Sequence, residues 1–503
     1  MKKYLAVLLG VLFLFGVTAT AFAIHEPAVP DVENAVVSQG PSKITLGGKM
    51  VLRGWYFENI NSSALPAKTG SQALYTTNVY LTVDAKIADN LQAFLELETA
   101  SGTQGNQNSG VYYWGTYDSK PNADILIRQA WVQYVGSGLL GVPTGIKAGH
   151  FLVALGEKQF LDNTRFGNDG IILWVDPTKE LHLALATTKL NEGATALGSM
   201  SNTDDLDGYF AILTYMWDKD NTVGANVTWA HTDGVIPSLK SDRQIEDEEG
   251  NLVTEKFANC DDMNFYNVGV HANGKIAGFS YALEGDWQFG KAKGLRTVDE
   301  LGDIVDSGDA DFKGWGVFAK VGYMLDPVNI RASFAMGSGN DGDDEGDIKE
   351  FQTLVGTDNT SAIARFTHYT LVYERMVRTA AAQGVMTTKL GGNIRTTGIA
   401  NTTYVNLGVD VNPMKDLSVS LDGFWLKATD TGLWEAELSE DGDQRSVEDD
   451  IGWEIDVKAN YKIAKNISYF VEGGVLIAGD FYKDIAGAKK DAFTAIHGLL
   501  VTF

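Results

Sequence analysis

The residues of this sequence with the most recognisable chemical spacing are Gly136, Gly138 and Gly141, which form a literal G-x-G-x-x-G. A dinucleotide site of this type needs a helix directly after the glycines, because the amide groups at the helix N-terminus hold the pyrophosphate. Here Pro143 and a strand-like stretch, residues 145–151, follow instead. The sequence therefore predicts a turn at this place and no nucleotide site.

A second chemical pattern, in residues 341–352, imitates the loop of an EF-hand calcium site. Asp341, Asp343 and Glu345 stand at positions 1, 3 and 5 of such a loop, but position 12 is Gln352, where the motif needs a bidentate glutamate. No helical pattern flanks the loop, so an EF-hand is not expected. A looser surface calcium site formed by the three acidic residues stays open, beside the alternative of a solvated acidic loop.

The other residues that could do catalytic or cofactor chemistry are scattered along the chain. The seven histidines show no zinc-ligand spacing, and no Ser/His/Asp grouping can be argued from spacing. Cys260 is the only cysteine, which excludes an internal disulfide and a c-type haem motif. We therefore expect no enzyme and no bound cofactor.

Alternation of apolar and polar residues is the strongest structural pattern, and it predicts β-strands. Ile44 and Leu46 share one face of the first strand, Lys49 and Arg53 lie on the other, and residues 451–461 alternate just as cleanly. A hydrophobic content of 44% without long apolar runs suits strands that have one lipid-facing side and one polar side.

Both chain ends indicate an exported membrane protein. Residues 1–23 combine Lys2 and Lys3 with an apolar run and an Ala-Phe-Ala sequence that ends at Ala23, which predicts a signal peptide and its cleavage site. A retained membrane anchor is the alternative. The chain ends on an alternating strand whose last residue is Phe503. This strand resembles the closing strand of outer-membrane β-barrels, whose terminal aromatic residue is part of the assembly signal.

The connections between predicted strands alternate between short turns, such as 88–90 and 273–275, and long polar stretches, such as 232–262. Both chain ends then fall on the short-turn side, which requires an even number of strands. We predict an all-β fold, a transmembrane antiparallel up-and-down β-barrel of about 18 strands (range 16–20). It should cover residues 43–503, after a periplasmic lead-in at 24–42.

Aromatic residues near the predicted strand ends are expected to form the interfacial girdles of such a barrel. A barrel of this size is expected to have no apolar core to fill. The residues concerned are Trp55, Tyr56, Phe57, Trp174, Trp217, Trp287, Trp315, Phe424 and Trp425.

Charged residues on the polar faces are the candidate pore lining. Acidic residues outnumber basic ones on these faces, which predicts a modest preference for cations. The candidates on the predicted strands are Lys49, Arg53, Glu96, Glu98, Glu454 and Asp456.

Residues 362–398 alternate poorly and carry an excess of positive charge, so we expect an insertion that folds into the lumen. Its candidate constriction residues are Arg365, Arg375, Arg378 and Arg395. The alternative is that these arginines bind lipopolysaccharide phosphates at the rim of the barrel.

The mature chain as a whole resembles Gram-negative outer-membrane porins. The sequence Ser338-Gly339-Asn340-Asp341-Gly342-Asp343-Asp344, with Phe351 shortly after, is similar to the Ser-Gly-Asp loop of alginate-export-type barrels. The hairpin from Asn401 to Ala428 is similar to a late hairpin of that group. The resemblance implies a transport channel. The chain departs from it in charge, because an alginate exporter needs a basic lumen and this chain has a formal net charge of −25.

These patterns predict a porin of the bacterial outer membrane that lets small hydrophilic solutes or ions diffuse passively, with a weak cation preference. The alternatives are a specific exporter of an anionic polysaccharide and the barrel sheath of a porin–cytochrome electron conduit. The expected partners are outer-membrane lipid and lipopolysaccharide, the barrel-assembly machinery and the solutes themselves, and a homotrimer stays open. The acidic charge argues against nucleic acid.

Overall fold

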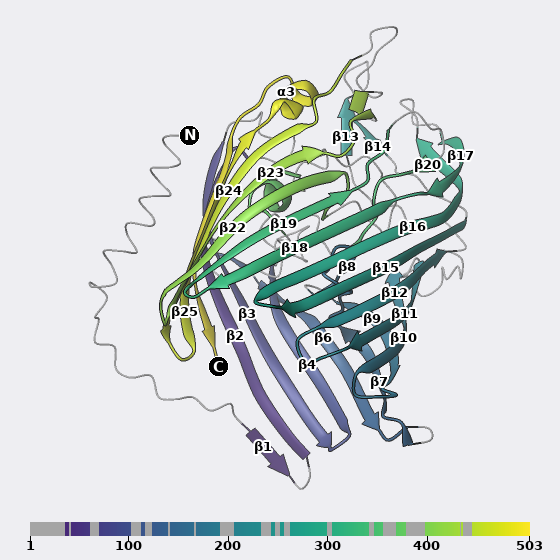
Figure 1. Cartoon of the computed structure of the whole chain (residues 1–503), viewed down its shortest axis with the longest axis vertical. Helices are drawn as coiled ribbons and strands as arrows, with labels where there is room; N and C mark the ends of the chain where they lie inside the picture. The colour runs from purple at the N-terminus through teal and green to yellow at the C-terminus, as the bar shows by residue number, and fades with distance from the viewer. Residues whose placement is uncertain are drawn as a thin grey trace.

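The computed structural model is a β-barrel built from long antiparallel strands, with short turns at one end and long connections at the other (Figure 1). It describes residues 36–39, 42–60, 70–101, 112–115, 123–138, 141–164, 167–191, 206–232, 243–246, 252–255, 262–298, 304–341, 347–355, 369–378, 398–432, 434–435 and 445–503. The proposed signal peptide and most of the proposed lead-in lie outside these residues.

Eighteen strands form the barrel wall, each paired antiparallel with the next one around the ring. They are β2(Ser42–Glu58), β3(Ser71–Ala88), β4(Leu91–Ser101), β6(Ala123–Gly136), β7(Thr144–Phe151), β9(Asn168–Val175), β10(Leu181–Asn191), β11(Leu206–Met216), β12(Thr222–Thr232), β15(Asp262–Ile276), β16(Phe279–Val298), β18(Trp315–Leu325), β19(Val328–Gly337), β22(Thr402–Met414), β23(Leu417–Ala428), β24(Asp450–Ala464), β25(Ile467–Ala478) and β26(Ala492–Thr502).

The ring closes between its first and last strands. β2 pairs with β26 from Lys49 opposite Thr502 to Glu58 opposite Phe493. This closure leaves no unpaired edge in the wall, which a sheet exposed to lipid requires. The fold class expected from the sequence, a closed antiparallel barrel of 18 strands, is confirmed.

Shorter elements extend the wall or lie at its ends and inside it. The two-residue and four-residue strands are β1(Val36–Gln39), β5(Tyr112–Tyr113), β8(Leu161–Asp162), β13(Arg243–Glu246), β14(Leu252–Glu255), β20(Asp347–Ile348) and β21(Leu354–Val355). The others are β17(Ile304–Phe312), the π-helical turn η3(Tyr373–Arg378) and the helix α3(Asp480–Ala486). None of the described helices is long and apolar enough to cross a membrane.

The outer surface of the wall is apolar, whereas its inner surface carries polar side chains and, toward one end, apolar ones, because successive side chains of a strand point to opposite faces. On the outer face, Leu185 is 62% exposed and Leu407 is 68% exposed, whereas Asn267 and Glu454 on the inner face are fully buried. Four outward rings stack along one row of the wall, with centroids 5.0, 6.2 and 5.2 Å apart, as an interfacial girdle would. They are Tyr209, Trp229, Tyr266 and Phe289.

Only some of the aromatic residues expected in the girdles face outward. Tyr56, Trp217, Trp287 and Trp315 are exposed, but Trp55, Phe57 and Phe424 are buried inside the barrel. Three consecutive aromatics cannot all face lipid in a strand of period two, so Trp55 and Phe57 point inward around Tyr56. There they pack with Ile496 of β26.

The expectation that the barrel has no apolar core is wrong. A buried apolar cluster occupies the barrel interior toward the end with the long connections. It joins strand residues such as Met263 and Phe265 to residues of the connections, such as Phe160, Phe351 and Tyr373.

One short turn lies a few residues from its expected place. Asn273 and Lys275 belong to β15, and the chain reverses at Ala277 and Gly278. Both turn residues have positive φ, 52° and 88°. A two-residue turn of this conformation has the twist that a tight hairpin needs. The strands therefore pair up to this turn, and Asn273-Gly274, which the sequence suggested as the turn, stays within β15.

The terminal residue takes part in closing the barrel. Phe503 N donates to Gly48 O over 3.1 Å, and Gly48 N donates to Phe503 O over 2.8 Å. The Phe503 ring lies across Gly48 on the outer face, where a Cβ would meet the ring at 2.7 Å.

We predict that deletion of Phe503 lowers the amount of protein assembled in the outer membrane, because it removes the last pair of closing hydrogen bonds and the terminal ring. Phe503→Tyr is the matched control and should assemble normally. The measurement is the heat-modifiable band in outer-membrane fractions. Normal assembly of the deleted chain would contradict the assembly role of Phe503.

Candidate functional site

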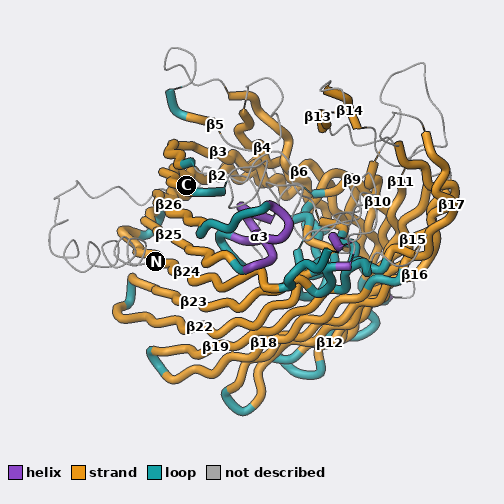
Figure 2. The backbone as a smooth tube through the Cα atoms, turned by 90° about the horizontal axis from the view of Figure 1, so that it is seen from above, coloured by secondary structure: helices purple, strands orange, loops and turns teal. Residues whose placement is uncertain are grey.

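Parts of two connections occupy the barrel interior, beside Phe481 and Tyr482 of α3, which belong to the same buried cluster (Figure 2). One is the connection between β7 and β9, residues 153–163. The other is the connection between β19 and β22, of which residues 350–355, 369–378 and 398–401 contribute. We call these four segments the inner assembly. They lie inside the barrel, so their attachment to the wall defines the candidate site.

Glu284, on the inner face of β16, holds the first part of the inner assembly. Its carboxylate accepts backbone N–H groups from Gln159 at 3.2 Å and Phe160 at 3.3 Å, and also from Glu157. Gly156 lies directly beside this carboxylate with φ +52°, and a Cβ there would come within 2.6 Å of Glu284 Oε2. A glycine is therefore needed for the segment to approach the wall.

Glu454 and Asp456, on the inner face of β24, hold the second part in the same manner. Glu454 accepts the N–H of Val372 at 2.6 Å and of Tyr373 at 2.8 Å, and Asp456 accepts the N–H of Leu371 at 3.0 Å. Both acidic residues are buried. Buried backbone N–H groups need acceptors, so these two carboxyl groups fix the start of η3 to the wall.

The two parts of the inner assembly are joined to each other. β8 and β21 pair in parallel, and Leu354 N donates to Phe160 O over 2.8 Å. Gln288 of β16 adds a wall contact to the second part, since its side chain donates to Gln352 O at 2.6 Å and accepts from Gln352 N at 2.8 Å. The assembly is thus one connected body fixed to both β16 and β24.

A second acidic pair, Glu96 and Glu98 of β4, holds an arginine. Arg128 Nη1 lies 2.5 Å from Glu96 Oε2, Arg128 Nε lies 3.7 Å from Glu98, and Arg128 Nη2 donates to Thr164 O at 2.7 Å. Gln129 also donates to Glu96, at 2.6 Å. Residues 128 and 129 reach the same carboxylate because a β-bulge shifts the pairing of β4 with β6 between Glu96 and Leu97.

Arg331 of β19 forms a charge cluster that the sequence did not reveal. Its guanidinium binds Asp410 of β22 at 2.7 Å and Asp422 of β23 at 2.9 Å. Residue 331 lies far in sequence from the hairpin that carries 410 and 422, and the pairing of β19 with β22 brings the three together on the inner face. Inward alternation was the sole sequence signal for them.

The structure places the predicted lining residues of the strands on the inner face, but their exposure to solvent differs. Lys49 and Arg53 are partly exposed, whereas Glu96 and Glu98 are buried. Lys49 Nζ lies 4.1 Å from the centre of the Tyr80 ring, and Arg53 donates to Asn78 Oδ1 at 2.7 Å.

Glu454 and Asp456 also lie on the inner face, yet they are covered by the inner assembly, so their carboxylates do not meet solvent. Arg375 and Arg378 belong to η3, inside the barrel, but their side chains are outside the described part of the structure. Arg365 and Arg395 lie wholly outside the described residues. The constriction role of these four arginines stays a prediction.

The acidic rim at the end with the long connections is extensively paired with lysines. Lys293 lies 2.7 Å from Asp262, and Lys427 lies 2.6 Å from Asp449. Asp341, a candidate calcium ligand, lies 2.6 Å from Lys349, while Asp343 and Glu345 lie outside the described residues. On α3, the hydrogen bond from Lys489 lowers the pKa of Asp480 below its ordinary value.

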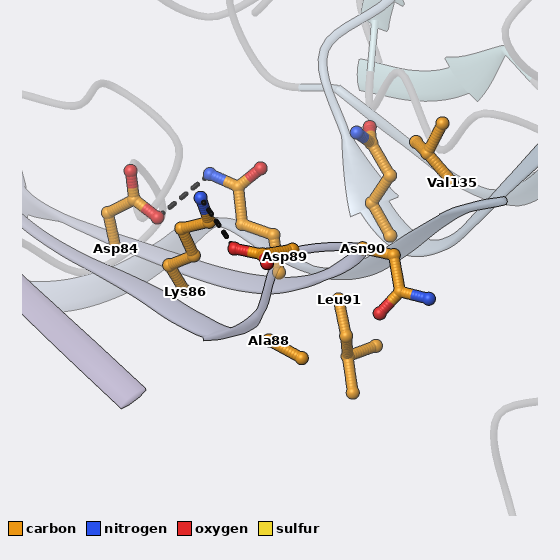
Figure 3. A pocket seen from close by; sticks show the side chains of 9 residues that line it. Asp84, Lys86, Ala88, Asp89, Asn90, Leu91 and Val135 are labelled. Atoms are coloured by element: carbon orange, nitrogen blue, oxygen red, sulfur yellow. Dashed lines mark hydrogen bonds and ion pairs between the residues drawn. The ribbon is translucent and has the colours of Figure 1, made fainter. Parts of the chain in front are cut away.

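A cavity of about 190 Å³ lies at the short-turn mouth, between the first strands (Figure 3). Gln92 donates to Asp84 at 2.8 Å across it, and Lys86 lies 3.5 Å from Asp89. Its small size and charged rim fit a vestibule better than an enclosed binding site.

Within the described residues, no group of three or more His, Cys, Asp or Glu is arranged to hold a metal ion. The inward groups are carboxylates engaged with amides or guanidinium, lysines and amide side chains. Such an arrangement can narrow and polarise a passage.

Comparison with known protein families supports a part of the resemblance that the sequence indicates. The family model for alginate export matches residues 380–495. This match includes the hairpin from Asn401 to Ala428, though not the loop that begins at Ser338. No curated protein matches the chain.

Among solved structures, the chain is similar to OccK2 (OpdF) of Pseudomonas aeruginosa, with 10% identity and a TM-score of 0.48, over 91% of this chain and 98% of that one. It is also similar to OccK8 (OprE) of the same organism, with 11% identity and a TM-score of 0.48 over the same shares. OccAB1 of Acinetobacter baumannii matches with 10% identity and a TM-score of 0.48, over 91% and 97%. Likeness at this level identifies no solute.

We predict that Glu284→Gln or Glu454→Gln loosens the inner assembly. The amide presents a donor to backbone N–H groups, and each buried group left unsatisfied costs about 1–3 kcal/mol. Single-channel recording in planar bilayers should show larger and noisier openings for both variants. Glu180→Gln, in an exposed short turn, is the matched control. Wild-type conductance in both inner variants would show that these carboxylates do not hold the passage narrow.

Proposed function

We propose that this protein is an outer-membrane channel for passive diffusion of small hydrophilic solutes or ions, narrowed by the inner assembly. The observation that carries the proposal is the attachment of that assembly to the wall through Glu284, Glu454 and Asp456. A barrel with an apolar outside and a polar, partly filled inside offers a solute a restricted aqueous path. The acidic groups that hold the assembly serve a structural role, and no reacting group is needed.

The occupied interior argues against a barrel sheath around a cytochrome. A sheath needs a lumen cleared of its own connections. Here the described segments are bonded to β16 and β24 and to each other, so a partner of protein size would have to displace them.

Charge selectivity depends on which charges the solute meets. The acidic residues counted on the predicted inner faces include Glu96, Glu98, Glu454 and Asp456, and all four are buried and bonded. We infer that these groups contribute little to selection among solutes. The expected cation preference then comes from the excess of acidic over basic residues in the connections at the outer mouth, which raises the local concentration of cations there.

Export of an anionic polysaccharide is the second candidate function. The match of residues 380–495 to the alginate-export family favours it. So do inward lysines that keep solvent exposure, since Lys147 and Lys458 are partly exposed and Lys320 is exposed. Lys147 lies 4.0 Å from the centre of the Trp131 ring, which positions its ammonium without neutralising its charge.

The test is the reversal potential across a KCl gradient, measured at low and at high ionic strength. Surface charge at the mouth acts over a Debye length of about 30 Å at 0.01 M salt and about 3 Å at 1 M. A mouth-driven cation preference should therefore appear at low salt and largely vanish at high salt. An anion preference that persists at 1 M would overturn the proposal in favour of the anionic polysaccharide.

A second measurement separates the two candidates directly. Addition of a soluble oligouronate to one side should leave the current of a diffusion channel nearly unchanged. A polysaccharide exporter should show concentration-dependent block instead, which Lys147→Gln should weaken. Lys219→Gln, in an exposed short turn, is the control for the loss of one positive charge.

A further inference from the structure

Behind the first part of the inner assembly, the wall carries a compact block of polar residues on three neighbouring strands. Pairing places Asn226 of β12, Gly269 of β15 and Asp286 of β16 in one row. The next row contains Thr228 and Asn267, followed by Gln288. All the side chains of the two rows are buried, with exposures of 5% or less.

Gly269 lets the side chains on its two sides approach each other. A Cβ built on Gly269 would lie 2.6 Å from Asn226 Nδ2, 2.6 Å from Asp286 Oδ1 and 3.0 Å from Asn226 Oδ1. The Asn226 amide and the Asp286 carboxylate therefore converge on the space that the glycine leaves open. Any larger residue at 269 would close this space.

Several oxygen atoms in this block have no hydrogen-bond partner among the described residues. They are Asn226 Oδ1, Thr228 Oγ1 and Asp286 Oδ2. The other carboxylate oxygen, Asp286 Oδ1, accepts one bond from Asn267 at 2.9 Å. Buried polar atoms need partners, so atoms that can accept call for a donor or a cation.

The charge balance favours a cation over a neutral donor. Asp286 lies two residues from Glu284 on the same strand face, and within the described residues no Lys, Arg or His forms an ion pair with either carboxylate. A buried pair of interacting carboxyls is costly unless a positive charge or a shared proton offsets it. One free carboxylate oxygen with neutral oxygens beside it suits a monovalent ion, since divalent sites usually gather several carboxylates.

We propose that Asn226 and Asp286, with Thr228 beside them, bind a partly dehydrated sodium ion between the barrel wall and the inner assembly. The ion offsets the charge of Asp286 next to Glu284, the residue that holds the backbone of residues 157–160. It therefore stabilises the attachment of residues 157–160 to the barrel wall. This inference does not depend on which solute crosses the channel.

The test compares thermal unfolding of the purified full chain in NaCl and in choline chloride at equal ionic strength. Choline carries its positive charge under three methyl groups and has no N–H to donate, so it cannot replace a partly dehydrated sodium ion. The wild-type protein should melt at a higher temperature in NaCl, with a saturable dependence on sodium concentration, because a ligand that binds only the folded state stabilises it. Asp286→Asn and Thr228→Val should reduce or abolish that difference.

Asp311→Asn, at the exposed rim, is the control and should keep the full sodium response. Equal melting in the two salts for the wild type would overturn the proposal, and would show that a proton or a buried water completes the block. A sodium response that survives in Asp286→Asn would overturn it as well. If Asp286→Asn does not assemble, the near-isosteric Thr228→Val decides alone, because its response must be weaker than that of the wild type.

Discussion

The interaction on which the rest of this structure depends is the hydrogen bond from a backbone N–H of the inner assembly to a buried carboxylate of the wall. Neither partner is stable there without the other. A carboxylate buried in the barrel without donors would be costly, and so would the unpaired N–H groups of an irregular segment. At Glu284 and Glu454 the backbone N–H groups satisfy the buried carboxylate, and the carboxylate satisfies the N–H groups. A segment without regular secondary structure is thereby held inside a regular β-barrel.

A barrel of 18 strands encloses more space than its own side chains can fill, and this chain fills the excess with its connections. Apolar residues such as Phe160, Phe351 and Tyr373 meet strand residues near the end with the long connections. Burial of these rings supplies the non-directional part of the stability, while the carboxylates set the position. Because the rings supply burial and the carboxylates supply direction, the inner assembly can be both tightly packed and aligned with particular strands.

The sequence predicted the wall well and its contents poorly, for a physical reason. Period-two alternation is local, so it assigns Lys49 and Arg53 to the inner face correctly. The contacts of the inner assembly join residues distant in sequence, such as Glu157 with Glu284 and Val372 with Glu454. Nothing local marks such pairs. One signal was available, because Glu96-Leu97-Glu98, Glu284-Gly285-Asp286 and Glu454-Ile455-Asp456 repeat an acidic-x-acidic pattern on an inner face.

A count of acidic and basic residues is therefore a poor guide to the field inside this barrel. The formal net charge of −25 includes carboxylates that solvent does not reach and carboxylates paired with lysine or arginine. A solute in the lumen responds to accessible, unneutralised charge, and on the described inner wall that includes Lys147 and Lys320. An acidic chain can thus present a passage whose sign differs from that of its mouth. The sign of the charge that a solute meets in each region depends on which charged side chains are buried or paired, and only the folded barrel determines that.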